Sequence, residues 1–175
     1  MARIWLIALC LLWLTPGFAQ KFGYVDMNYI LNQMPEYKEA QAEIDKLAKG
    51  WEGEIAEMYA DIEQMEATLK AEEVLLTADL KKERQAEIDR KMKELKDYQK
   101  QVFGYDGLYF LKKKELIKPV QDKVFEAVET VAKNNRLQIV FDKSGDLVMI
   151  YTDPIHDYTD YVLEELGLIE NKVTN

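Results

Sequence analysis

Residues 44–69 read IDKLAKGWEGEIAEMYADIEQMEATL, and their pattern decides the fold of this 175-residue chain. The apolar side chains recur every three or four positions, which is typical of a coiled-coil helix. One additional step of four falls near Trp51, and such a stutter locally unwinds a supercoil. Pro35 suits the first turn of this helix. The stripe comprises residues 37, 40, 44, 47, 51, 55, 58, 62, 65 and 69.

A second apolar stripe follows Leu76-Thr77, where Thr77 can cap a new helix. Residues whose numbers add to 153 would meet if the chain folded back at this point. We therefore expect a long antiparallel helical hairpin, an arm formed by residues 35–118 with its tip near 76–77. A register shifted by seven residues is the competing arrangement. The expected pairs are Ile44 with Tyr109, Trp51 with Val102, Ile55 with Tyr98, Met58 with Leu95, and Met65 with Ile88.

The two halves of this arm carry opposite net charge. Residues 36–76 contain twelve acidic residues and four lysines, whereas residues 77–118 contain eight acidic and twelve basic residues. Opposite signs favour antiparallel pairing, although each exposed ion pair contributes only about 0.2–1 kcal/mol. A helix of about 40 residues is roughly 60 Å long, so the hairpin should protrude.

The stretch from Val102 to Leu111 departs from the plain pattern. Tyr105 and Tyr109 continue the stripe, whereas Phe103 and Phe110 lie to one side of it. Gly104 and Gly107 each weaken a helix by about 1 kcal/mol relative to alanine. Three interpretations stay open: contacts with a neighbouring subunit, an apolar wall facing a cavity, or a locally unwound segment.

The flanking residues 20–34 and 119–175 are expected to form a small β-rich body. Strands are predicted at 22–27, 137–141 and 147–151. A helix should run from Pro119 to Asn134 with Val120, Val124, Val128 and Val131 inward, and a last helix from about Asp157 to before Gly167. Such a small three-strand body with open edges favours an oligomer. The fold class is thus mainly α, of the α+β type.

The first nineteen residues have the features of a cleaved export signal. Arg3 precedes an apolar run from Ile4 to Leu14. Gly17-Phe18-Ala19 then places small residues at the positions that a signal peptidase recognises, so cleavage is expected after Ala19. A stable membrane span needs about 20 apolar residues, so no stable membrane insertion is expected, and an uncleaved anchor is the alternative. Cys10, the one cysteine of the chain, lies in this segment. The mature chain would therefore lack disulfides and thiolate metal sites.

The rest of the sequence gives no sign of an enzyme. Residues 20–175 carry a net charge of −10, which disfavours nucleic-acid binding. The single histidine, His156, stands at a predicted helix start, and no phosphate-loop, H-E-x-x-H or G-x-S-x-G motif is present. Acidic pairs such as Glu72-Glu73 lack the pattern of a calcium loop. We predict no catalytic residue, cofactor or metal.

Three short segments around the hairpin carry a family likeness. Residues 21–27 (KFGYVDM), 137–142 (LQIVFD) and 157–163 (DYTDYVL), in this order, resemble the Skp (OmpH) family of periplasmic chaperones. The resemblance implies a jellyfish-like homotrimer with three arms around a central cavity. It also implies an ATP-independent holdase that keeps unfolded outer-membrane β-barrel proteins from aggregating in the periplasm. Well-known members are basic, whereas this chain is acidic.

Two sets of residues are candidates for these roles. Methionine and aromatic side chains adapt to varied partners, although packing within the arm is their alternative role. The client-facing candidates are Phe103, Phe110, Met58, Met65 and Met92. The candidates for the trimer body are Tyr24, Val25, Leu137, Ile139 and Phe141. An envelope coiled-coil adaptor that binds one folded partner is the alternative function.

Overall fold

The computed structural model describes residues 20–145 and 148–169, most of which are helical. The chain divides into two compact units: Tyr29–Phe125 forms one, and the residues up to Asn28 with those from Glu126 onward form the other. The predicted export signal, residues 1–19 with Cys10, lies outside the described residues.

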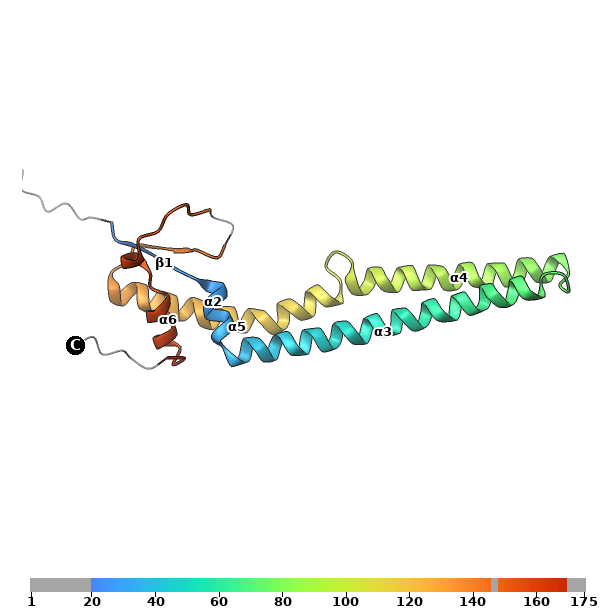
Figure 1. Cartoon of the computed structure of the whole chain (residues 1–175), viewed down its shortest axis with the longest axis horizontal. Coiled ribbons are helices and arrows are strands. Elements are labelled where there is room, and N and C mark those ends of the chain that lie inside the picture. The colour runs from blue at the N-terminus through green and yellow to red at the C-terminus, as the bar shows by residue number, and fades with distance from the viewer. Residues whose placement is uncertain (1–19, 146–147, 170–175) are drawn as a thin grey trace, which may run out of the picture. The chain divides into compact units, whose positions relative to one another are not determined.

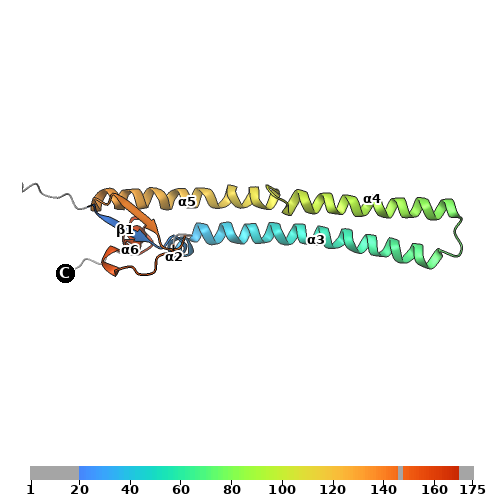
Figure 2. The ribbon, with the colours of Figure 1, turned by 90° about the horizontal axis from the view of Figure 1, so that it is seen from above.

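The unit Tyr29–Phe125 contains the predicted hairpin. Helix α3 (Pro35–Glu72) lies side by side with α4 (Ala78–Phe103) in both views (Figures 1 and 2). Pro35 occupies the first turn of α3, as expected. Thr77 caps α4, because its hydroxyl accepts a hydrogen bond of 3.3 Å from the backbone N–H of Leu80. The predicted turn near residues 76–77 is therefore confirmed.

The half of the hairpin nearer the tip has the predicted register. Ile62, Ile88 and Leu95 form its buried centre. The Tyr98 hydroxyl donates a hydrogen bond to the Glu54 carboxylate, one residue from its expected partner Ile55. Further side chains pack against this centre: Ile55, Met58, Met65, Leu69 and Met92.

The second half of the hairpin is two helices rather than one. Helix α4 ends at Phe103, and α5 (Leu108–Asn135) begins after a turn in which Asp106 has a φ of 55°. Of the three interpretations of this stretch, the structure has the unwound segment. Its glycines make the helix costly here, and aspartate tolerates a left-handed backbone better than most residues. Tyr105, expected on the apolar stripe, is instead 99% exposed, so that prediction is wrong.

Beyond the turn the register slips. Ala40, Ile44 and Ile117 form a second buried cluster, to which Tyr109 also belongs. Glu36 pairs with Lys123 at 3.1 Å, although a constant register would have placed Ile117 opposite it. Because the residues of the turn are not helical, the second half of the hairpin uses more residues than α3 does to cover the same length. The pairing of residues beyond the turn is therefore shifted.

The prediction that a helix begins at Pro119 is wrong. Helix α5 runs through this proline without interruption. Proline removes the hydrogen bond to the carbonyl four residues earlier, which belongs to Glu115. Both residues are exposed, so water can hydrogen-bond to the freed carbonyl group. Val120, Val124 and Val131 are buried, as expected for the inward face.

The other unit contains a two-stranded parallel sheet. Strand β1 (Phe22–Val25) pairs with β2 (Ile139–Asp142), with Phe22 opposite Ile139 and Tyr24 opposite Phe141. Leu137 precedes the strand that was expected to include it. Helix α2 (Met27–Gln33) follows β1 directly.

The third predicted strand is not present in the described residues. Residues 148–151 form no strand, and Leu147 lies outside the described part of the chain. Val148 and Ile150 are 85% and 98% exposed. Their alternation resembles that of a strand, but no strand of this unit hydrogen-bonds to them, so the prediction of a three-strand body is wrong for this segment.

The predicted last helix is confirmed as α6 (Thr159–Glu165), preceded by the short 3-10 helix η1 (Pro154–His156). Residues just before α6 dock on β1. The Tyr158 backbone N–H donates to the Tyr24 carbonyl at 2.9 Å, and the Tyr158 ring lies so close to Gly23 that a Cβ atom there would collide with it. Gly23 is therefore required for this contact. Gly167, with a φ of 70°, follows the helix.

The cap of α4 gives a direct test of the hairpin turn. Thr77→Ala should lower the free energy of unfolding by about 0.5–2 kcal/mol, because the N–H of Leu80 loses its acceptor. Thr68→Ala is the matched control, since the Thr68 hydroxyl only donates to the Gln64 carbonyl within α3. Urea unfolding followed by circular dichroism measures both variants. Equal stability of the two would contradict the assigned cap.

Candidate functional site

Three aromatic side chains meet at the turn between α4 and α5. The ring of Phe103 lies 6.3 Å from Trp51, edge to face, and 5.9 Å from Tyr109. Phe103 nevertheless keeps 43% of its surface exposed, and Phe110 in the first turn of α5 keeps 49%. Both predicted client-facing phenylalanines are thus accessible on the single chain. Phe103 also has a packing role, because its ring contacts those of Trp51 and Tyr109.

The three predicted client-facing methionines have a structural role. Met58, Met65 and Met92 are partly buried and pack against the cluster of Ile62, Ile88 and Leu95. These contacts favour the alternative reading of the methionines, in which they fill the space between α3 and α4. Their contact with a client stays a prediction.

Midway along the arm, a groove with a volume of about 620 Å³ is strongly acidic. The Glu54 carboxylate accepts the hydrogen bond of the Tyr98 hydroxyl, and this bond raises the pKa of Tyr98 above its usual value. Among residues 20–145 and 148–169, no group of acidic, histidine or cysteine side chains could hold a metal ion. The carboxylates of the groove belong to Glu54, Glu57, Asp61, Glu94 and Asp97.

Two exposed carboxylates have lowered pKa values. A backbone hydrogen bond at the start of α3, together with the ion pair to Lys123, lowers the pKa of Glu36. The hydrogen bond from Lys133 lowers the pKa of Glu129 one turn earlier in α5. Both carboxylates are solvent-exposed and both pKa values are lowered, so neither has the raised pKa of a general acid.

One face of the sheet in the other unit is apolar and only partly covered. Phe22, Ile139 and Phe141 are 48%, 49% and 36% exposed. Tyr24 and Val25, predicted for the trimer body, are buried within their own chain, and Leu137 is half-buried. Of the five predicted body residues, Ile139 and Phe141 therefore present the most surface to a partner.

A largely apolar hollow of about 410 Å³ adjoins this face. Phe22, Met149 and Tyr151 line it, and the ring of His156 lies 4.6 Å from Phe22. The prediction omitted Phe22, although its spacing of two from Tyr24 places both side chains on one face of β1. The residues after β2 could not be assigned to the hollow from the sequence, because they were expected to form a strand.

Comparisons with known proteins agree with this architecture. The family model described as "Outer membrane protein (OmpH-like)" matches residues 21–166. An uncharacterized protein of Aquifex aeolicus (strain VF5) is 31% identical over 150 residues, which are 86% of this chain and 88% of that protein. The crystal structure of an OmpH-like protein of Caulobacter crescentus CB15, described as a candidate outer membrane chaperone, superposes with a TM-score of 0.67. It is 13% identical and covers 88% of this chain and 86% of its own.

The fold defines a class of proteins in which a long helical hairpin accompanies a small parallel sheet. The chain belongs to the OmpH-like family, also called the Skp family. Within the described residues, no helix combines the length and the apolar character that crossing a membrane requires.

The buried centre of the arm can be tested with one leucine pair. Leu95→Ala should destabilise the chain by about 2–5 kcal/mol, because Leu95 is fully buried between α3 and α4. Leu80→Ala on the same helix removes the same atoms from a side chain that is 46% exposed, and should cost much less. Chemical denaturation measures both changes, and a Leu95→Ala variant as stable as Leu80→Ala would refute the assigned packing.

Proposed function

We propose that this protein is an ATP-independent periplasmic holdase chaperone that binds unfolded outer-membrane β-barrel proteins. The observation that carries the proposal is the OmpH-like family match over residues 21–166. The Caulobacter crescentus structure of the same fold, described as a candidate outer membrane chaperone, supports it. Export to the periplasm would follow from the signal predicted at residues 1–19.

The holding state would be a homotrimer whose three arms surround a cavity. Phe22, Ile139 and Phe141 would form part of the contact between subunits, since an apolar face of this kind is seldom left in water. Three arms on one scaffold would bind an unfolded chain through many weak contacts, and their shared attachment would raise the avidity. Such a mechanism needs no nucleotide and no catalytic residue.

Client contact would be distributed along the arm rather than concentrated at one residue. Phe103 and Phe110 offer accessible aromatic surface, and the half-buried methionines Met58, Met65 and Met92 would contribute their exposed edges. The acidic groove beside Glu54 and Asp97 would favour basic segments of a client. This attraction should weaken as salt rises, because the screening length is only about 8 Å at physiological ionic strength.

Aggregation assays test the holdase activity. A β-barrel membrane protein diluted from urea should stay soluble when about one trimer is present for each client molecule. Light scattering records the aggregation, and serum albumin at the same mass concentration is the control. Continued aggregation at a tenfold excess of trimer would refute the holdase. A single tightly bound folded partner in pull-downs would instead support the adaptor alternative.

The proposed subunit contact can be tested by a charge on the apolar sheet face. Ile139→Glu should shift the protein from trimer toward monomer by at least about tenfold in concentration, because burying an unpaired carboxylate costs more than 1.4 kcal/mol. Leu111→Glu on α5 is the control, since Leu111 is similarly exposed, at 51% against 49%. Sedimentation equilibrium measures the mass. A trimeric Ile139→Glu protein would rule out this face.

A further inference from the structure

Three of the seven methionines of the chain pack in one contact of the arm. Met58, Met65 and Met92 lie against the buried centre between α3 and α4, and each is half-buried. Residues 20–175 contain no cysteine, so methionine supplies all of their sulfur. Because the two helices share a single apolar stripe, a polar atom at any of these side chains would lie in the contact on which their pairing depends.

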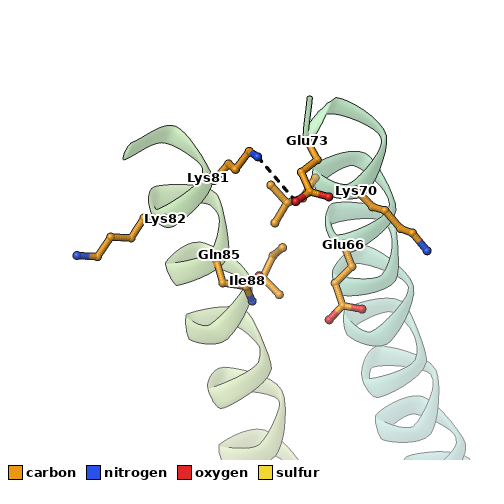
Figure 3. A pocket seen from close by; sticks show the side chains of 8 residues that line it. Glu66, Lys70, Glu73, Lys81, Lys82, Gln85 and Ile88 are labelled. Atoms are coloured by element: carbon orange, nitrogen blue, oxygen red, sulfur yellow. Dashed lines mark ion pairs between the residues drawn. The ribbon is translucent and has the colours of Figure 1, made fainter. Parts of the chain in front are cut away.

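Grooves between α3 and α4 lead to two of these methionines. Met58 lines the acidic groove of about 620 Å³, and Met65 lines a groove of about 330 Å³ nearer the tip. Figure 3 shows a further groove at this end, of about 490 Å³, where Lys70 and Lys82 point away from the gap and do not cover it. The edges of the contact are thus open, and a small oxidant can reach both methionines while the helices stay paired.

The reaction of methionine with a peroxide changes the polarity of its side chain. A lone pair on the thioether sulfur attacks one oxygen of hydrogen peroxide, so that an S–O bond forms and the O–O bond breaks. The leaving hydroxide takes up the proton of the transferred oxygen. The sulfur is thereby oxidised by two electrons to the sulfoxide, and the peroxide is reduced to water. The sulfoxide oxygen accepts hydrogen bonds, and it destabilises an apolar contact if no donor reaches it.

The surroundings of Met58 are poor in donors. Besides Met58, the acidic groove is lined by five carboxylates, the Tyr98 hydroxyl and the Gln101 amide. Ionised carboxylates accept hydrogen bonds but donate none, and the Tyr98 hydroxyl already donates to Glu54. Among the lining side chains, a sulfoxide oxygen at Met58 would therefore have Gln101 as its donor and five acceptors beside it.

The surroundings of Met65 are different, although it lies seven residues further along the same helix face. Its groove is lined by Arg84 and Lys91 as well as by two carboxylates, those of Asp61 and Glu72. A guanidinium group has five N–H donors and an ammonium group three. A sulfoxide at Met65 would thus find donors that the acidic groove lacks.

We propose that Met58 is an oxidation site at which a peroxide loosens the pairing of α3 with α4. The sulfoxide places an acceptor among acceptors beside the buried centre of the arm, and methionine sulfoxide reductases reverse the change. The site belongs to the arm itself and would exist whether or not the protein is a holdase.

Two matched variants of the full-length protein test this site. Met65→Leu with Met92→Leu keeps Met58, and Met58→Leu with Met92→Leu keeps Met65. Leucine is close to methionine in volume, so both variants should fold. Each is compared with itself before and after hydrogen peroxide by urea unfolding followed by circular dichroism, and any oxidation outside the arm is common to both.

Peroxide should raise the unfolding equilibrium constant of the variant that keeps Met58 about tenfold, because a polar oxygen is left without a sufficient donor. The variant that keeps Met65 should change by less than about threefold, since Arg84 and Lys91 can donate to its sulfoxide. Treatment with both methionine sulfoxide reductases should restore the first variant. Peptide mapping by mass spectrometry should find Met58 oxidised before Met34, which is 2% exposed.

Four outcomes would overturn the oxidation site. They are oxidation of Met58 no faster than that of Met34, unchanged stability of the variant that keeps Met58, equal loss of stability in the two variants, and a loss that the reductases do not restore.

Discussion

The arm depends on one narrow apolar contact between α3 and its partner helices. A pair of helices has a single interface, so each helix can bury only the stripe that faces the other. Ile62, Ile88 and Leu95 occupy the centre of that interface near the tip, and Ala40, Ile44 and Ile117 occupy it at the other end. Ion pairs between α3 and the second arm, such as Glu36 with Lys123, are exposed and add little.

The interruption of this contact has causes in both halves of the helical hairpin. The stutter near Trp51 shifts the apolar stripe of α3 around its helix axis. The turn between α4 and α5 allows α5 to face the shifted stripe. Trp51, Phe103 and Tyr109 fill the space between the two buried clusters. Phe103 can therefore be both a packing residue and an accessible one, because no helix continues past it.

Local signals made much of the arm predictable, and nonlocal ones limited the rest. Pro35, Thr77 and the pairing of Met65 with Ile88 follow from spacing and capping, which depend on neighbours in sequence. The continuity of α5 through Pro119 depends on where the lost hydrogen bond faces, which a sequence does not state. The segment 148–151 has a strand-like alternation but no strand beside it, and pairing is a property of the whole unit. The accessible Ile139 and Phe141 were predicted as site residues, whereas Phe22 was recoverable from its spacing to Tyr24.

Exposed apolar side chains occur in both units at places where no further helix or strand covers them. At the arm tip the interface ends at Leu69 and Ile88, so Val74 and Leu75 have no helix against which to pack. In the other unit, two strands give a sheet with one face covered by the residues around Tyr158 and the other only partly covered at Phe141. A larger core would have buried these side chains, and no apolar surface would have formed at either place. The small cores are thus the reason that the described residues leave apolar side chains exposed, and the repulsion between acidic surfaces opposes nonspecific association of such side chains.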